Sequence, residues 1–538
     1  MFVAQSAALA LLFTPFFAIV LLYNLLDAII LTQYPGFSIE AHKKKIAAFE
    51  RARSFPKVAI MIPAAGEAIE IVQKTLMAAT KVAYPNYTTF LLDDSKEAIY
   101  RDIVLHSTGS YFRRTNTGYH KKAGNLNALL GKITNEAYDY VLVLDADFVP
   151  DENILKELMP YADPDVGIVQ SPQHFLINDE VYKRSKFEYG AALIQRDFYR
   201  ITQRARNRMY GAICVGTNAL YNVKALEKVG GYEGVGRAEW GHSEDVNTGL
   251  KMINTTNEFG QRYRIEYVPV RLATGICPDD HLSFYQQQNR WATGSMQLMF
   301  SKKTLFSSNL TFYQKLCYLT NSTYYFYTIA ILFSPLQLLV LLLLNPSFDW
   351  QSTLLFLPSL LIGTAIGPIA LRRHFRPVAS SLVMLSNAYT FAQAFFLLLI
   401  KRPLGWEATG SKSAKKRNVH FIHFKIFCSI FFIGTYMSVL VVLLMNLRLE
   451  FSPLLIISGL FLIAFISHLI YLHHMLLLAA DRSKLHRDAH AYVYAVLCGI
   501  VLIVSVASLS VAGKYDVQLS RHTVVTLAPQ PITHKENE

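Results

Sequence analysis

The sequence predicts a mostly parallel α/β domain that faces water and is inserted between membrane-spanning α-helices. Two observations predict this fold class. Apolar stretches close to the ~20 residues that cross a bilayer core occur at residues 1–26 and recur after residue 320. Between about residues 50 and 300, short apolar strands alternate with helical patterns, as in a parallel sheet covered by helices. We expect four parts: an N-terminal transmembrane helix (1–40), the α/β domain (50–300), interface helices with five transmembrane helices (301–515), and a polar tail (516–538).

The first apolar segment predicts an uncleaved membrane anchor. Met1 to Leu26 carries no charged side chain, and the segment lacks the basic start and the small-residue cleavage site of a signal peptide. The basic run "HKKK" follows at 42–45. By the positive-inside rule, the α/β domain is expected in the cytoplasm, with Met1 outside.

The C-terminal half predicts further spans at 324–344, 354–371, 426–445, 454–472 and 492–512. Residues 378–400 have two possible placements, because Ser, Asn and Gln interrupt their apolar pattern. If this segment crossed the membrane, the loop 401–418, with six basic residues and one acidic residue, would lie outside. If it lies along the interface, that loop stays inside, which satisfies the charge rule everywhere. We therefore expect six spans in an integral protein of the plasma (inner) membrane.

The charge balance points to lipid rather than to nucleic acid. The formal net charge is +13, and 52% of the residues are hydrophobic. Basic loops that face the anionic cytoplasmic surface of a bilayer account for this charge. We therefore expect the lipid bilayer as a partner and no nucleic acid.

Carboxylates follow two of the strands expected in the α/β domain. Strands are predicted at 57–63, 88–95, 140–147 and 166–172, with a helix over 67–80 and another starting near Asn125. Asp93 and Asp94 end the second strand, and Asp145 and Asp147 end the third. Either pair alone could simply form a turn or cap a helix. Because ligands of parallel sheets gather at the carboxyl ends of strands, two such pairs indicate a shared site.

An Asp-x-Asp at a strand end is suited to Mg²⁺ or Mn²⁺. These hard ions prefer carboxylate and phosphate oxygens, so Asp145 and Asp147 are the predicted metal ligands. A cation there would neutralise a diphosphate leaving group. Lys122 precedes a predicted helix in "HKKAGNLNALL" and would supply a further positive charge for phosphate. Taken alone, "KAGNLN" is also what an ordinary helix start would look like.

Two later motifs contribute candidate catalytic and acceptor groups. "GHSEDVNTGLKM" (241–252) places Glu244 and Asp245 at a helix start, where Asp245 could cap the helix or act as a general base. "YQQQNRWATG" (285–294) groups Gln287, Arg290 and Trp291 within about one helical turn. The Arg290 guanidinium can bind a diphosphate, and Trp291 offers a flat surface for a sugar ring.

The ordered motifs "LLDDS", "KAGNLN", "LDADFVP", "VQSP", "SEDVNTG" and "QQNRW" resemble the processive family 2 glycosyltransferases. These are the membrane synthases of cellulose, other β-glucans, chitin and hyaluronan. The resemblance covers about residues 55–295. It implies a GT-A-type domain that transfers a sugar from a UDP-sugar donor to a growing polysaccharide acceptor with inversion, and exports the product through its own helices. It is also compatible with accessory subunits or a homo-oligomer.

The resemblance also implies roles for individual residues. Asp245 would be the catalytic base, with Glu244 beside it, and Asp145 and Asp147 would bind metal. The other roles it implies are nucleotide-sugar binding by Glu67, Asp93 or Asp94, Lys122, Asp145, Gln287 and Arg290; acceptor binding by Trp291, Thr217 and Asn218; and gating by Trp406, Thr409 and Lys412 in "LGWEATGSK".

Some residues depart from the family pattern. "IPAAGE" (62–67) replaces the usual Pro-Thr-x-Asn-Glu, which puts uracil contacts there in doubt. The Gln-Gln form of "QQNRW" is closer to hyaluronan and chitin synthases, whereas the loop at 404–412 is closer to glucan synthases. Our expectation is a β-glucan made from UDP-glucose. The alternatives are a hyaluronan or chitin synthase that uses UDP-N-acetylglucosamine, a single-transfer enzyme with a lipid acceptor, and a non-catalytic membrane transporter or scaffold.

Overall fold

The computed structural model describes residues 2–34, 36–233, 243–278, 281–299, 309–344 and 377–400. The chain divides into two compact units, Met1–Ser334 with Gln351–Ser429, and Pro335–Trp350 with Ile430–Glu538. Apart from the end of helix α14, all of the described residues belong to the first unit.

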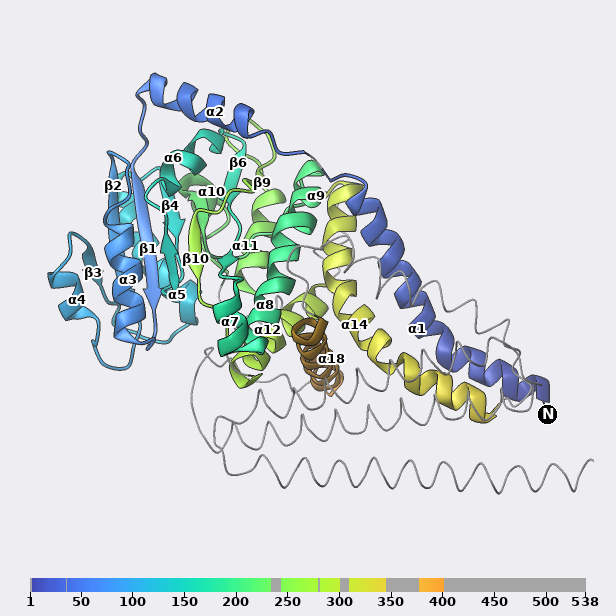
Figure 1. The fold of residues 1–538 in the computed structure, drawn as a ribbon. Helices are drawn as coiled ribbons and strands as arrows, with labels where there is room; N and C mark the ends of the chain where they lie inside the picture. Colours follow the sequence, from blue (N-terminus) through green and yellow to red (C-terminus); the bar gives the residue numbers. More distant parts are fainter. Residues whose placement is uncertain are drawn as a thin grey trace, which may run out of the picture. The chain divides into compact units, whose positions relative to one another are not determined.

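The main sheet has seven strands in the order β3-β2-β1-β4-β8-β6-β9 (Figure 1). Its strands are β1 Val58–Ala64, β2 Tyr87–Asp93, β3 Ser110–Phe112, β4 Tyr140–Val143, β6 Val166–Gln170, β8 Ala219–Asn222 and β9 Arg264–Tyr267. All neighbouring pairs are parallel except those made by β8, which runs antiparallel to both β4 and β6. The prediction of a mostly parallel sheet is therefore confirmed. A second sheet, with the order β5-β10-β7, consists of β5 Phe148–Pro150, β7 His174–Phe175 and β10 Ala273–Gly275.

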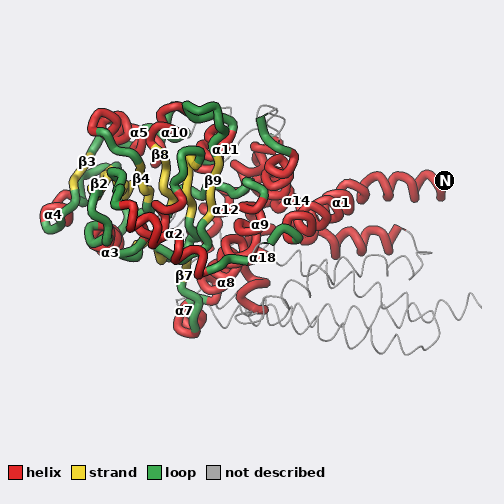
Figure 2. Tube along the Cα trace, turned by 90° about the horizontal axis from the view of Figure 1, so that it is seen from above, coloured by secondary structure: helices red, strands yellow, loops and turns green. Residues whose placement is uncertain are grey.

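Helices enclose the strands, which lie in the middle of the domain (Figure 2). The helical segments are α1 Phe2–Leu31, α2 Ile39–Ala52, α3 Ile69–Ala79, α4 Arg101–Leu105, α5 Lys121–Ile133, η1 Thr134–Glu136, α6 Ile154–Leu158, η2 Met159–Tyr161, α7 Asp179–Arg184, α8 Lys186–Asp197, the π-helical turn η3 Phe198–Thr202, α9 Gln203–Arg208, α10 Val223–Lys228, α11 Glu244–Ile253, α12 His281–Met299, α14 Phe312–Leu344 and α18 Pro377–Leu399.

Strand β1 shows how the sequence produces a three-layer core. Successive side chains of a strand point to opposite faces of its sheet. Ala59 and Met61 pack in a core with α5, α10 and α11. Val58, Ile60 and Ile62 pack in a second core with α3, α4 and α6. Because both faces of β1 are covered, all seven of its residues are buried, which explains the continuous apolar run in the sequence.

Helix α2, which follows the predicted anchor, is tied to the domain by polar contacts. His42 is 5% exposed; its Nδ1 lies 2.7 Å from the Tyr161 hydroxyl and its Nε2 pairs with Glu157. The Lys45 ammonium lies 4.4 Å from the centre of the Tyr161 ring. The basic run at 42–45 therefore makes contacts within the protein as well as carrying charge.

The polar residues that interrupt 378–400 lie in a packed helix. Helix α18 contacts α8 and α12, and Ser386, Asn387 and Thr390 are all buried. The Tyr285 hydroxyl of α12 donates to the Gln393 side chain at 2.6 Å. These residues therefore belong to a helix–helix interface, which accounts for the broken apolar pattern.

Helix α1 contains residues 2–26 of the first predicted span, and helix α14 contains the predicted span 324–344. Among the residues that the structure describes, no helix combines the length and the apolar character that a membrane crossing requires. The spans predicted at 354–371, 426–445, 454–472 and 492–512, the loop at 401–418 and the polar tail lie outside the described residues. The membrane arrangement therefore stays a prediction.

Replacing Phe391 tests the α12–α18 interface. This side chain is fully buried against Ala292, Met296 and Tyr325, so Phe391→Ala should lower the free energy of unfolding by about 3–5 kcal/mol. Phe396→Ala is the matched control, because that ring is 59% exposed on the same helix. Denaturant titration of the purified protein measures both. Equal destabilisation by the two variants would contradict the packing described here.

Candidate functional site

The candidate site lies where polar residues follow the strands of the main sheet. Glu67 follows β1, Asp94 follows β2, and Asp145 and Asp147 follow β4. Because β1, β2 and β4 run parallel, their carboxyl ends share one edge of the sheet. The fold therefore gathers the carboxylates as the sequence predicted.

Lys122 is the cation at the centre of this edge. It lies in the first turn of α5, where it donates to Asp145 Oδ1 at 2.5 Å and to the Gly216 carbonyl at 2.8 Å. Burial lowers the pKa of Lys122, but the charges of Asp145, Glu244 and Asp245 outweigh that effect and raise it overall. Lys122 is thus a permanent positive charge shared by carboxylates from two motifs.

Asp147 is a carboxyl group that is difficult to ionise. Burial, then the neighbouring charge of Asp145, raise its pKa to about 7, and Glu67 adds to the shift. A divalent cation would relieve this repulsion, and Mg²⁺ is commonly bound through one or two carboxylates together with substrate phosphates. Within the described ranges, no three His, Cys, Asp or Glu side chains come together as a possible metal site. A metal site at Asp145 and Asp147 therefore stays a prediction.

Asp245 lies at the start of α11, as predicted. Burial, then Glu244, raise its pKa to about 7, while the Val246 backbone N–H, donating to Asp245 Oδ1 at 2.8 Å, opposes the shift. A carboxylate with a pKa near neutrality is well matched to general-base catalysis. Gly216 has φ +75°, and a Cβ built on it would lie 2.9 Å from the Asp245 Cβ. The absence of a side chain at Gly216 is what allows this approach.

Helix α12 brings the second predicted motif to the same place. Burial lowers the pKa of Arg290, whereas the nearby Glu244, Asp145 and Asp245 oppose that shift. The guanidinium therefore lies within electrostatic reach of the carboxylates that surround Lys122. Gln287 and Trp291 are partly buried on the same helix, and the Gln287 Oε1 is buried without a hydrogen-bond partner among the described residues.

The carboxylates predicted to contact uridine already have protein partners. Asp93 is fully buried, accepts from the Tyr111 hydroxyl at 2.7 Å and lies 3.2 Å from an Arg113 nitrogen. Asp94 receives two bonds from Arg114, at 2.8 and 2.7 Å, and one from the Gly118 N–H at 3.0 Å. Arg114 also donates to the Lys121 carbonyl at 3.3 Å. Both aspartates thus hold the segment that leads to Lys122, and a uridine contact stays a prediction.

Thr217 and Asn218 were expected at the acceptor, but both side chains are fully buried. The Thr217 hydroxyl accepts from the Asp145 backbone N–H at 2.9 Å, and the Asn218 amide donates to the Pro172 carbonyl at 3.2 Å. Both side chains thus hold neighbouring backbone groups in place, and a contact with the acceptor stays a prediction. Glu67 Oε2 accepts from the Ala65 N–H at 2.6 Å, so it also stabilises its own loop.

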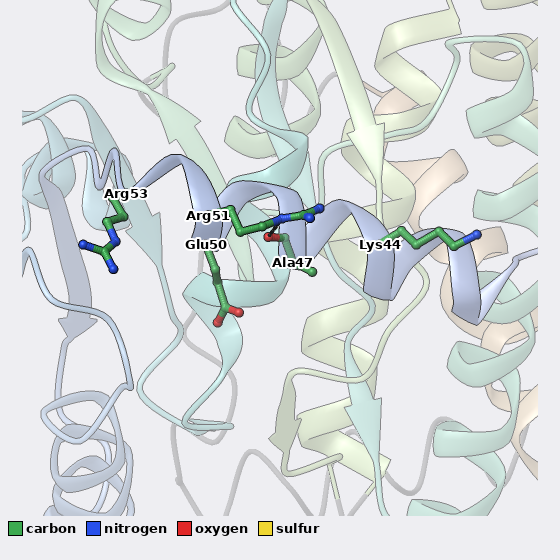
Figure 3. A pocket seen from close by; sticks show the side chains of 5 residues that line it. All are labelled: Lys44, Ala47, Glu50, Arg51 and Arg53. Atoms are coloured by element: carbon green, nitrogen blue, oxygen red, sulfur yellow. Dashed lines mark hydrogen bonds between the residues drawn. The ribbon is translucent and has the colours of Figure 1, made fainter.

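The gating residues Trp406, Thr409 and Lys412 lie outside the described residues. A surface hollow of about 570 Å³ is lined by Lys44, Ala47, Glu50, Arg51 and Arg53 (Figure 3). None of these residues belongs to the predicted site. We therefore place the candidate site at the edge of the main sheet where β1, β2 and β4 end, and not in this hollow.

Residues 56–294 match the family model described as Glycosyltransferase like family 2. These residues belong to that family. The match spans the whole main sheet and ends within α12, so it includes Lys122, Asp145, Asp245 and Arg290. The α/β domain is thus a family 2 glycosyltransferase domain.

Named relatives of this domain are bacterial cellulose synthase subunits. The chain is 30% identical over 280 residues to the cellulose synthase catalytic subunit [UDP-forming] of Xanthomonas axonopodis pv. citri, covering 51% of this chain and 36% of that protein. It is 28% identical over 292 residues to the cellulose synthase 1 catalytic subunit [UDP-forming] of Komagataeibacter xylinus, covering 53% and 37%. The similarity therefore spans a little over a third of the length of these relatives.

Among solved structures, the mannosyltransferase PcManGT from Pyrobaculum calidifontis in complex with GDP-Man and Mn²⁺ has a TM-score of 0.46 and 16% identity. The comparison covers 70% of this chain and 99% of that chain. A similarity this low does not bear on the site.

The pH dependence of stability tests the environment of Asp147. The carboxyl titrates near ~3.9 when unfolded and at about 7 when folded, so the stability that its neutral form contributes is lost as pH rises between these values. Asp147→Asn keeps the group neutral. Its melting temperature should therefore exceed that of the wild type increasingly from pH 4 to pH 7, and by a constant amount above pH 7.

Thermal scans in chelator measure this difference without interference from cations. Asp102→Asn serves as the control, because it makes the same chemical change at a carboxyl group that is exposed on α4. If the Asp147→Asn difference were the same at pH 4.5 and pH 8, the raised pKa would be excluded.

Proposed function

We propose that the chain is a processive, inverting glycosyltransferase that builds a β-glucan from UDP-glucose and exports it through its own membrane helices. The observation that carries the proposal is the position of Asp245, a carboxyl group with a raised pKa, beside a cationic edge formed by Lys122 and Arg290. The relatives are cellulose synthase subunits described as UDP-forming, which supports the choice of donor and product.

In this proposal the donor binds along the edge with its diphosphate near Lys122 and Arg290. A divalent cation on Asp145 and Asp147 would supply further charge neutralisation for the departing UDP. Lys122 and Arg290 hold the diphosphate oxygens and stabilise the charge that develops as the bond to the anomeric carbon breaks. These side chains are fixed by α5 and α12, so little reorganisation is needed at the moment of reaction.

The acceptor hydroxyl attacks the anomeric carbon from the side opposite to UDP. Asp245 takes the hydroxyl proton as the new carbon–oxygen bond forms, and UDP leaves with the electron pair of the old one. Attack from the opposite side inverts the configuration at that carbon. Trp291, ten residues into α12, would support the acceptor ring, and Gln287 would face the donor.

The arrangement in a membrane is also part of the proposal. Its support is the apolar pattern of the sequence after residue 320, together with basic "HKKK" and the basic loop at 401–418. We assign the catalytic domain to the cytoplasm and the growing polymer to a path between helices. Closure of the 404–412 loop over bound UDP, through Trp406 and Thr409, would exclude water during transfer.

Substitution of the proposed base separates chemistry from binding. Asp245→Asn should lower kcat by about 10²–10⁴, because the variant cannot accept the hydroxyl proton, while UDP affinity changes little. To measure kcat, the protein is incubated with UDP-glucose, and the released UDP and the length of the product on a gel are determined. Calorimetric titration with UDP measures the affinity. Turnover within threefold of the wild type would remove Asp245 from this role.

The metal proposal is tested by removal and by substitution. Asp145→Ala and Asp147→Ala should each weaken UDP binding in Mg²⁺ or Mn²⁺ and have little effect in its absence, since their affinity for the diphosphate acts through the cation. Chelation should abolish UDP release by the wild type, and added cation should restore it. Full activity after thorough chelation would show that Asp145 and Asp147 do not act through a metal ion.

Comparing UDP release from UDP-glucose and from UDP-N-acetylglucosamine identifies the donor.

A further inference from the structure

Gln170 is a buried glutamine outside the predicted site. It ends strand β6, is fully buried, and pairs in register with Ala219 of β8. Its Oε1 accepts from the Val215 N–H at 3.1 Å, and its Nε2 donates to the Thr217 carbonyl at 2.9 Å. One side-chain amide therefore clamps the chain on both sides of Gly216.

The orientation of this amide is fixed by its partners. Nε2 also donates to the Ser171 carbonyl at 2.6 Å, so the nitrogen faces carbonyls while the oxygen faces an N–H. Rotating the amide by 180° would set oxygen against oxygen and nitrogen against nitrogen. In a fully buried location, each lost bond leaves a polar group without water to replace it. The clamp is therefore a defined structure with one arrangement.

The segment held by Gln170, Val215–Asn218, touches three groups of the proposed reaction. The Gly216 carbonyl accepts from Lys122, and the Thr217 hydroxyl accepts from the Asp145 N–H. Gly216 itself, at φ +75°, packs directly against Asp245. Lys122 and Asp145 also contact each other and belong to α5 and the end of β4. Asp245, at the start of α11, comes close to this edge at Gly216.

We infer that Gln170 is a positioning residue that, by clamping Val215–Asn218, sets the place of the Asp245 carboxylate relative to the donor-binding edge. The inference rests on the proposed function in so far as Asp245 is the base. A displacement of about 1 Å in a reacting group can lower the rate about 10²-fold. Loss of the clamp should therefore affect kcat far more than the binding of UDP.

Gln170→Met tests the inference, because methionine has similar length and volume and forms neither bond. We expect kcat for UDP release to fall about 10–100-fold and the dissociation constant for UDP to change by less than threefold. Amide hydrogen exchange of a peptide covering 215–218 should become faster. Gln170→Asn, which keeps the amide but is one methylene shorter, replaces Gln170→Met if that variant does not fold, with the same expectations.

Gln203→Met is the matched control. Gln203 is also fully buried and clamps Ile213, just before the Val215–Asn218 segment, accepting from the Ile213 N–H at 3.1 Å and donating to the Ile213 carbonyl at 2.6 Å. It does not touch Val215–Asn218, so its replacement should lower stability without separating kcat from UDP binding.

Three results would overturn the inference. One is a kcat for Gln170→Met within threefold of the wild type, and another is unchanged exchange at 215–218. The third is a parallel loss of UDP binding and kcat in a variant that is folded, which indicates a general structural defect and not a positioning role. If the wild type releases no UDP from any UDP-sugar, the proposed function fails, and hydrogen exchange still decides whether Gln170 holds the segment.

Discussion

The Lys122 ammonium donates both to the Asp145 carboxylate and to the Gly216 carbonyl, and so joins three segments that are distant in the sequence. Carboxylates that are partly withdrawn from water repel one another, and an uncompensated charge there would be costly. Lys122 offsets this repulsion for Asp145, Glu244 and Asp245 at once. Without it, the edge could collect acidic side chains only by keeping more of them protonated.

The antiparallel strand β8 is what brings Gly216 to Lys122. Strand β8 lies between β4 and β6 and runs opposite to both. Its first residues therefore lie at the edge where β4 and β6 end, and the segment just before it, Val215–Asn218, reaches the same edge. A parallel β8 would place this segment at the far end of the sheet. The reversal thus supplies a backbone carbonyl and a close-packed glycine to a site otherwise made by strand ends and by residues of α5, α11 and α12.

The sequence was sufficient to predict the positions of elements that have a local signal, such as a continuous apolar run or a helix start. Strands β1, β2, β4 and β6 and the helix beginning at Glu244 lie where the pattern predicted, because covered strands and helix starts have local signals. Strand β8 was not predicted, since "ALYN" is short and its partners are distant in sequence. The small sheet β5-β10-β7 was missed for the same reason, its strands being only two or three residues long.

The site was predictable in its charged members and less so in the groups that hold them. Asp145, Asp147, Lys122, Asp245 and Arg290 carry charges whose grouping has few structural explanations. Thr217 and Asn218 are expected at the acceptor, and the structure adds that both are buried and bond to the Asp145 N–H and the Pro172 carbonyl. Gln170 was visible as a polar residue at the end of an apolar strand, but its two partners follow more than 40 residues later. Only the folded chain shows which carbonyl and which N–H it meets.

The charge balance at this edge also constrains how a donor could bind under the proposed function. Burial and neighbouring carboxylates raise the pKa of both Asp147 and Asp245 to about 7. A diphosphate that paired with Lys122 and Arg290 would bring further negative charge and favour protonation of Asp245, the state that cannot act as a base. A divalent cation entering with the diphosphate supplies the opposite charge and favours ionised carboxylates. A bound metal ion would then favour the ionised form of Asp245 as well as the departure of UDP, since both depend on the electrostatic potential at the same edge of the sheet.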